Sequence, residues 1–354
     1  MKQLKLNETP VRTSRNFNIN NIKLDNINIP NDIHEFNNIQ IAGDSSNINN
    51  NVSDISLKYG IGNTLTQQIQ EQSNVKLCIN CRNTLQCAQY MQINFKFDKN
   101  NTTLVDNIEI LAEENSKATI ILKYGSNGDF EDWHNGLIRI NAKKGSEINI
   151  VIANLMNTNS NNFISFENNI EENAKVKYTI IDFGGKNSIT NYYSNIIGDN
   201  ADNTINTIYL GKENQLFDLN YIGELRGKKS NIDIEVQGAL KDTSKKHFKG
   251  TIDFKKGCKK ATGNENEACM LLSDTAKSLA LPMLLCSEED VEGNHSSSAG
   301  KIGEKELFYI MSRGFELKEA MKLIVRARFN KVLENIENEK LKEEIINEID
   351  LRLD

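Results

Sequence analysis

Short alternations of apolar and polar residues recur along the middle of the chain. Residues 91–97 (Met-Gln-Ile-Asn-Phe-Lys-Phe) and 205–210 (Ile-Asn-Thr-Ile-Tyr-Leu) are two of them. A period of about two residues places alternate side chains on one face of a strand. Residues 75–302 contain a single proline, Pro282, and show little helical periodicity. The pattern therefore predicts a mainly β domain over residues 75–302.

The predicted strands belong to a repeat. Four units begin at Asn115, Gly145, Asn173 and Asn200, at spacings of 30, 28 and 27 residues. Each first residue is one that tolerates positive φ, and a small residue, a charged position and a strand follow it. A period of this length is typical of a solenoid, whose units bury their apolar faces only when they stack. We expect a parallel β-helix, with a β-sandwich as the alternative.

Different patterns flank this domain. Thirteen of the first 50 residues are Asn, which favours turns, so we expect residues 1–74 to be irregular with short elements. From Gly303 onward the apolar period becomes helical, and Gly314 is placed to stop the first helix. We expect a C-terminal helical domain over residues 303–354, with helices over 304–313, 316–336 and about 341–353.

Composition narrows the possible functions. The 354 residues are 38% apolar and carry a net charge of −6, so the chain is globular and has no overall attraction for nucleic acid. Its longest apolar stretch, residues 279–286, is too short to cross a bilayer. Six cysteines are too few for a disulfide scaffold, and the first residues lack a secretory signal. We predict a cytoplasmic protein that binds neither nucleic acid nor membrane.

Three cysteines, Cys78, Cys81 and Cys87, have a spacing that suggests a metal site. A structural zinc site needs four ligands, and no second pair or nearby histidine completes this set. Cys78 and Cys81 lie in a strand-like run, where a separation of three residues places them on opposite faces. We interpret them as ordinary small apolar residues, with a metal or redox site as the alternative.

Motifs of independent catalysis are missing from the sequence. It contains no P-loop, no G-x-S-x-G nucleophile elbow and no H-E-x-x-H metal motif. We therefore expect a chain that hydrolyses no ATP and has no catalytic residue of its own.

The best candidate for chemistry is His295. It lies in a segment of carboxylates and hydroxyls that includes Asp290 and Glu292. Imidazole is the commonest ligand of transition metals in proteins, and a neighbouring carboxylate can orient it or complete the shell. The residues alone leave a hydrogen-bonded loop histidine as the alternative.

Four segments of the C-terminal half resemble the SufB/SufD family of iron–sulfur cluster assembly proteins, in order and spacing. The most specific is the Leu-Phe-Tyr-x-x-Ser-Arg-Gly pattern of residues 307–314. The other three are residues 250–254, 267–274 and 289–295. The resemblance implies a right-handed parallel β-helix with a C-terminal α-helical domain, in agreement with the repeat.

The resemblance also implies a function. Family members are non-catalytic scaffolds of the SUF system that pair with a SufB-type subunit, or with a second copy, and bind the SufC ATPase. The implied cofactor is a transient iron–sulfur cluster or iron, which His295 and Glu292 would hold together with the partner subunit. Where SufB-type proteins have a sulfur-accepting cysteine this chain has Glu267, so it resembles SufD. Gly293 stands where SufD-type proteins often carry a cysteine, so a thiolate ligand from this chain would have to be Cys286 or Cys269.

A basic run on the second predicted helix suits a helix that docks in a groove of another protein. We assign partner binding to Lys322, Arg326 and Arg328, and to Phe308 and Tyr309 of the resembling segment. A solvated helix face is the alternative for the basic run. For the whole chain, the alternatives are a homodimeric SufB-like scaffold and a β-helix carbohydrate-active enzyme.

Overall fold

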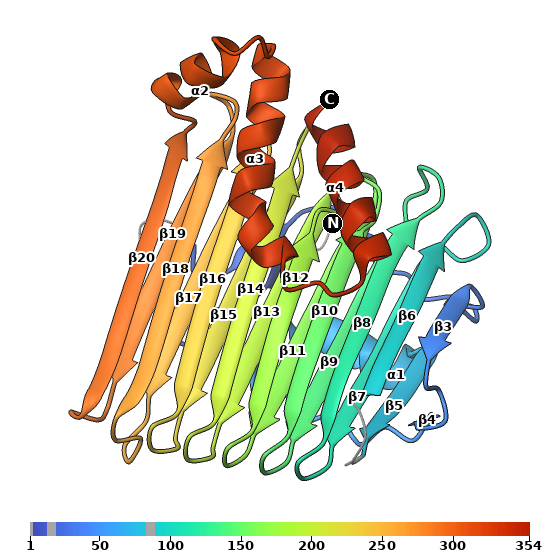
Figure 1. Cartoon of the computed structure of the whole chain (residues 1–354). Coiled ribbons are helices and arrows are strands. Elements are labelled where there is room, and N and C mark those ends of the chain that lie inside the picture. The colour runs from blue at the N-terminus through green and yellow to red at the C-terminus, as the bar shows by residue number, and fades with distance from the viewer. Residues whose placement is uncertain (1–2, 13–18, 83–88) are drawn as a thin grey trace.

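Two long sheets face each other along the whole molecule, and the chain passes from one sheet to the other at every turn (Figure 1). The computed structural model describes residues 3–12, 19–82 and 89–354. Sheet 1 contains β3 (Ile39–Gly43), β6 (Gln89–Phe97), β8 (Lys117–Ser126), β10 (Glu147–Leu155), β12 (Lys175–Asp182), β14 (Asp202–Gly211), β16 (Asn231–Leu240), β18 (Ala261–Leu271) and β20 (Val291–Lys301).

Sheet 2 contains β4 (Ile48–Asn49), β5 (Val75–Cys81), β7 (Thr103–Ala112), β9 (Trp133–Ala142), β11 (Asn161–Ile170), β13 (Asn187–Ile196), β15 (Leu216–Leu225), β17 (Lys245–Phe254) and β19 (Lys277–Cys286). From β5 to β18, each strand pairs in parallel with the strand two positions further along the chain. The exceptions are at the N-terminal end, where β3 pairs antiparallel with β6 and β4 pairs antiparallel with β5. This arrangement is a parallel β-solenoid, as the repeat predicts, and the β-sandwich alternative is wrong.

The predicted repeat sets the register of the coils. Lys117, Glu147, Lys175 and Asp202 lie side by side on successive strands of sheet 1, two residues after the four predicted turn residues. Those turn residues all have positive φ, between 56° and 70°. Their backbone N–H groups also donate hydrogen bonds to carbonyl oxygens of the next coil. The nitrogen of Asn115, for example, lies 3.0 Å from the carbonyl oxygen of Lys144. The hydrogen-bonded ladder therefore continues through the turns.

Apolar side chains from both sheets fill the interior. An aromatic column runs along it through Tyr178, Tyr192, Tyr221 and Phe248, with ring centroids 5.1 to 5.8 Å apart. All four side chains are fully buried. Stacking of similar residues from coil to coil is the way in which a unit that cannot bury its own face becomes stable.

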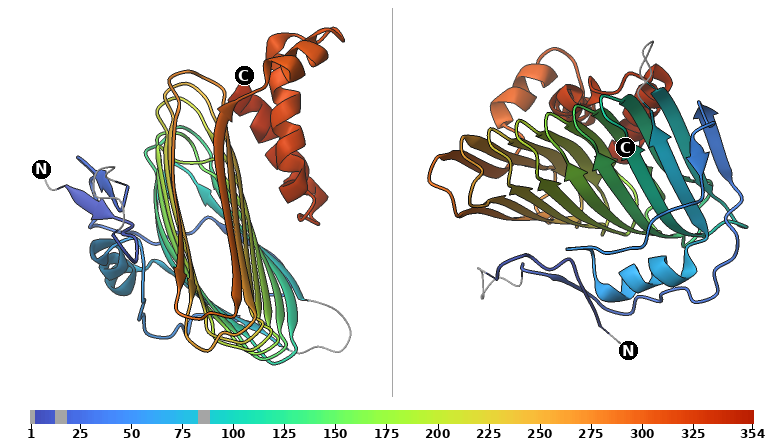
Figure 2. Two further views of the ribbon diagram at one scale, coloured as in Figure 1. Left: turned by 90° about the vertical axis from the view of Figure 1, so that its left-hand side faces the viewer. Right: turned by 90° about the horizontal axis from the view of Figure 1, so that it is seen from below.

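Three helices follow the solenoid: α2 (Glu304–Met311), α3 (Leu317–Leu333) and α4 (Glu339–Leu353). Helices α3 and α4 cover part of the outer face of sheet 1 (Figures 1 and 2). That face is apolar where they lie, and Phe183 of the solenoid packs on Phe329 of α3. Gly314 has φ +98° after α2, as predicted for a residue that ends a helix. None of the described helices is long and apolar enough to cross a membrane.

The N-terminal region lies on the opposite side, against the outer face of sheet 2 (Figure 2). Its elements on this face are the antiparallel pair β1 (Leu4–Leu6) and β2 (Ile22–Leu24) and the helix α1 (Asn63–Gln72). The short strands β3 and β4 of the same region instead extend the ends of sheets 1 and 2. Asn7 is fully buried and bonds to Asp218 of β15. The region is irregular between short elements, as expected, but the sequence did not specify α1, a polar helix with four glutamines.

Candidate functional site

The last coil of the solenoid has an open side. Strands β19 and β20 stand at the ends of their sheets, and among the described residues each pairs with one neighbour only, β17 and β18 respectively. Unpaired N–H and C=O groups along such an edge can receive another strand. The inner faces of these two strands are correspondingly more exposed than those of the preceding coils.

His295 lies on β20, in register with Glu265 of β18. Glu265 is 2% exposed and belongs to the inner row of β18, so His295 is on the row that faces the interior of the coil. The imidazole itself is exposed, because no further coil covers it among the described residues. Glu292 pairs with Thr262 and is three residues from His295, so it lies on the outer face. The structure does not bring these two predicted ligands together.

Beneath His295, the interior contains a charged cluster that the sequence did not indicate. The ammonium of Lys246 is 2.6 Å from the carboxylate of Glu267, and both side chains are fully buried. Tyr209 and Ser297 donate hydrogen bonds to Glu267, over 3.3 and 2.8 Å. Lys246 also donates to the carbonyl of Leu279 over 3.3 Å. Glu267 is therefore held in place by an ion pair and two hydroxyl groups.

Glu265, by contrast, has no partner for either carboxylate oxygen within the described part of the chain. Burial, and secondarily the charge of Glu267, raises its pKa to about 8. The side chain reaches across the interior to Gly250 of sheet 2, where a Cβ atom would come within 2.0 Å of Glu265 Oε2. Gly250 thus leaves the space that the carboxylate fills.

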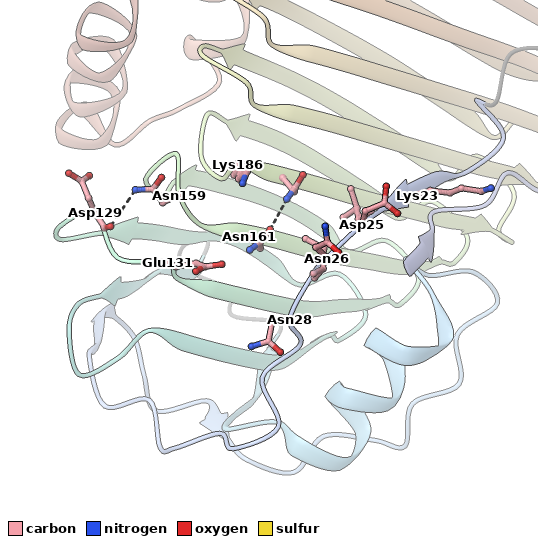
Figure 3. A pocket seen from close by; sticks show the side chains of 12 residues that line it. Lys23, Asp25, Asn26, Asn28, Asp129, Glu131, Asn159, Asn161 and Lys186 are labelled. Carbon is pink, nitrogen blue, oxygen red and sulfur yellow. Dashed lines mark hydrogen bonds between the residues drawn. The ribbon is translucent and has the colours of Figure 1, made fainter. Parts of the chain in front are cut away.

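Two hollows that do not include Glu265 lie at the surface of the solenoid. One of about 610 Å³ lies at the open end and is lined by Phe254, Leu284, Cys286, Glu288, Glu289 and Gly293, among others. Another of about 680 Å³ lies between the segment that follows β2 and the turns of the solenoid (Figure 3). Its lining of asparagines, carboxylates and two lysines contains none of the predicted site residues.

A family profile described as "SUF system FeS cluster assembly, SufBD core domain" matches residues 95–328, about two thirds of the chain. The chain belongs to the SufB/SufD family. It is 22% identical over 265 residues to the iron–sulfur cluster assembly protein SufD of Bacillus subtilis, a match that covers 74% of this chain and 61% of that protein. It is 22% identical over 241 residues to SufD of Escherichia coli, covering 68% and 57%.

A SufBD family protein of Pyrococcus horikoshii is 31% identical over 170 residues, covering 47% of this chain and 37% of that protein. The chain thus matches about three fifths or less of the length of these relatives. The SufBD match extends from β6 into α3, and it includes the open coil with His295 and Glu265.

The cysteines of this SufBD protein are mostly buried. Cys78 and Cys81 are buried on opposite faces of β5, as the spacing predicts, and burial raises the pKa of both thiols. Cys87 lies outside the described residues.

Cys269 shares the inner face of β18 with Glu265 and Glu267, and burial raises its pKa too. Cys286 is exposed at the end of β19. The described residues contain no group of three or more His, Cys, Asp or Glu side chains arranged to hold a metal ion.

The residues assigned to partner binding fall into two classes. On α2, Phe308 and Tyr309 are 76% and 60% exposed, so their rings are open to a partner. On α3, Lys322 binds Asp354 over 2.6 Å and Arg326 binds Asp350 over 2.7 Å, both at the C-terminal end of α4 or beyond it. Arg328 is exposed. The charges of Lys322 and Arg326 thus already serve to hold α3 and α4 together.

Sequence reasoning missed Glu265, Lys246 and their neighbours for a definite reason. The segment Gly263-Asn264-Glu265-Asn266-Glu267 is polar at every position after the glycine. Because the residues of the inner face are as polar as those of the outer face, the apolar–polar alternation that marks an inner face is absent here. The one available signal was a pair of glutamates two residues apart in a predicted strand, which places both on the same face.

Proposed function

We propose that this chain is a SufD-like, non-catalytic scaffold subunit of a SUF iron–sulfur cluster assembly complex. Its open coil pairs with a SufB-type subunit, its C-terminal helices bind a SufC-type ATPase, and iron or a nascent cluster is its cargo. The observation that carries the proposal is the position of His295, an exposed imidazole on the inner row of an unpaired terminal strand. A second solenoid that pairs with this edge would enclose the imidazole.

The SufD-like assignment is supported by Glu267. SufB-type proteins resembling this stretch place a sulfur-accepting cysteine at this position, and here a carboxylate is locked by Lys246, Tyr209 and Ser297. A carboxylate held in a fully buried ion pair cannot accept sulfur, so this position supplies no sulfur-accepting thiol. The names of the B. subtilis and E. coli relatives, both SufD, agree with this assignment.

Pairing with a second copy is the alternative favoured by the open edge itself. Both β19 and β20 end their sheets, so two identical edges can meet about a two-fold axis. The oligomeric state of the purified chain distinguishes the two arrangements. The match to the SufBD core profile favours a scaffold over the carbohydrate-active enzyme.

Binding of the ATPase is tested on α2. Replacing Phe308 and Tyr309 together by Asp is expected to abolish capture of a co-expressed SufC-type ATPase, because exposed aromatic side chains commonly dominate such interfaces. The matched control is Leu351→Asp on α4, at a leucine that is 66% exposed. Capture that survives the double substitution, or is lost equally in the control, contradicts the assignment.

A further inference from the structure

Stacked turns along one edge of the solenoid carry charged residues, and in earlier coils these charges alternate in sign. The turns join each strand of sheet 2 to the next strand of sheet 1 (Figure 1). Lys143 pairs with Glu171 over 2.6 Å, and Lys144 pairs with Glu172 over 3.0 Å. Each of these lysines thus meets a carboxylate of the next turn, which lies about 4.8 Å further along the solenoid.

The alternation ends at two later turns, one between β15 and β16 and the other between β17 and β18. Lys228 and Lys229 belong to the first turn, and Lys256, Lys259 and Lys260 belong to the second. The N–H of Lys229 donates to the carbonyl of Lys259 over 2.9 Å, so the two turns lie side by side. All five lysines are exposed, and none forms an ion pair within the part of the chain that the structure describes. We refer to these five residues as the lysine ridge.

Two lysines of the ridge also occupy an unfavourable backbone conformation. The register of sheet 1 aligns Lys229 and Lys260 with Asn173 and Asn200 of earlier coils, each two residues before a paired position. All four have positive φ, which is 55° and 61° for the two lysines. Asparagine adopts this conformation more readily than lysine does. Strain and like charges in adjacent turns oppose folding, so they indicate that these side chains serve a contact outside the fold.

Carboxylates border the lysine ridge on both sides. Asp199 of the preceding turn accepts from the N–H of Lys228 over 2.7 Å, and Glu288 of the following turn accepts from the N–H of Gly257 over 2.9 Å. This N–H and, to a smaller extent, the charge of Lys259 lower the pKa of Glu288. The basic surface is therefore limited to two turns.

This limited size favours one kind of occupant. A nucleic acid or an anionic bilayer carries negative charge beyond two turns, where the bordering carboxylates repel it. The two turns, residues 226–230 and 255–260, also contain no aromatic residue on which a base could stack. A short acidic segment of a protein can place its carboxylates over the lysines and end before Asp199 and Glu288.

We propose that the lysine ridge is a docking surface for an acidic segment of another protein. The ridge precedes β16 and β18, whereas α2 follows the far end of β20, so the two surfaces lie at opposite edges of the solenoid (Figure 1). The acidic partner is thus bound separately from a partner on α2, which takes the inference beyond the proposed function. Attraction between the ridge and the segment speeds association and is weakened by salt.

The first test measures binding of a fluorescently labelled oligoglutamate peptide of about ten residues to the full-length chain. Wild type is expected to bind the peptide at low ionic strength and to lose affinity as salt is added. The double variant Lys228→Gln with Lys259→Gln should bind it about tenfold more weakly. The control, Lys143→Gln with Lys144→Gln, removes the same charge from lysines that are already ion-paired, and should change affinity less than about twofold.

A second pair of substitutions separates binding from folding. Lys229→Asn with Lys260→Asn introduces the residue found at this turn position in other coils. It should raise the melting temperature, because backbone strain and charge repulsion are relieved, and weaken peptide binding about tenfold. A variant that is more stable and binds less cannot owe the loss to unfolding. Peptide affinity equal to that of wild type in both ridge variants, or an equal loss in the Lys143 and Lys144 control, overturns the proposal.

The same assay distinguishes the acidic protein segment from other polyanions. Single-stranded DNA and vesicles that contain phosphatidylserine replace the peptide, and both are expected to bind more weakly than it does. If either binds as tightly as the peptide, and Lys228→Gln with Lys259→Gln removes that binding, the assignment to a protein segment is wrong. A chain that captures SufB-type and SufC-type partners but binds no oligoglutamate contradicts only the lysine ridge.

Discussion

Glycine occupies interior positions where the neighbouring coil or the opposite sheet supplies a large side chain. Gly238 pairs directly with Tyr209 on the adjacent strand, and a Cβ atom at Gly238 would lie 1.8 Å from the end of the tyrosine ring. Tyr209 is fully buried and in turn donates a hydrogen bond to Glu267. The missing Cβ atom of Gly238 therefore leaves the space for the Tyr209 ring, whose hydroxyl is one of the donors to Glu267.

At this residue scale we predict that Gly238→Ala destabilises the protein by about 1 to 3 kcal/mol, the usual effect of overpacking a filled interior. Gly300→Ala is the control, because a Cβ atom there meets nothing within 4 Å. Chemical denaturation of both variants measures the difference. An unchanged midpoint for Gly238→Ala would show that the Tyr209 ring moves away freely.

At the scale of elements, apolar and polar contacts join the C-terminal helices to the solenoid. Apolar side chains of α3 and α4 cover the outer face of sheet 1, with the rings of Phe183 and Phe329 6.3 Å apart. At the edge of this contact, Lys123 of β8 pairs with Glu344 of α4. Buried Arg352 of α4 also donates hydrogen bonds to the carbonyls of Phe183 and Met156. The partly exposed Lys123–Glu344 pair contributes little, so burial of apolar area and these buried hydrogen bonds supply the attachment.

Phe329→Ala is accordingly expected to lower the free energy of unfolding by about 3 to 5 kcal/mol, because it opens a cavity at a fully buried position. Hydrogen exchange should speed up across α3 and α4 more than in the solenoid. Phe308→Ala, which truncates an exposed ring on α2, is expected to change stability by less than about 0.5 kcal/mol. Equal effects of the two substitutions would contradict this description of the contact.

At the scale of the whole molecule, the N-terminal region holds coils of sheet 2 that are far away in the sequence. The Asn7 side chain donates to the backbone carbonyls of Thr190 and Asp218, and to the carboxylate of Asp218. Asp218 also forms a fully buried ion pair with Lys249 over 2.6 Å, and these charges hold its pKa below the usual value although burial opposes them. One asparagine thus links β13, β15 and, through Asp218, β17.

Asn7→Ala should destabilise the protein by about 2 to 4 kcal/mol, since it removes a buried amide donor from three acceptors, one of them the Asp218 carboxylate, which then keeps Lys249 as its donor. Asn26→Ala is the matched control, because Asn26 also has positive φ, 60° against 56°, but is exposed. Thermal denaturation of the two variants separates the lost hydrogen bonds from backbone strain. The prediction is wrong if the variants lose the same stability.

The sequence by itself determined the solenoid, its turns and the three C-terminal helices. Those features depend on local spacing: a residue that accepts positive φ every 27 to 30 positions sets both the turn and the register of the next coil. The same locality explains why the three helices predicted after Gly303 have bounds within three residues of those of α2, α3 and α4.

Only the tertiary structure decided what lies beside His295. Which residues meet inside a coil depends on strand pairing between segments about 30 residues apart and on which face turns inward. Glu265 came next to His295, and Glu292, closer in the sequence, lies on the opposite face. The contact of Asn7 with Asp218, 211 residues away, likewise follows from the path of the chain over sheet 2. The local pattern of apolar and polar residues does not predict such pairings, because they are set by the packing of the whole solenoid.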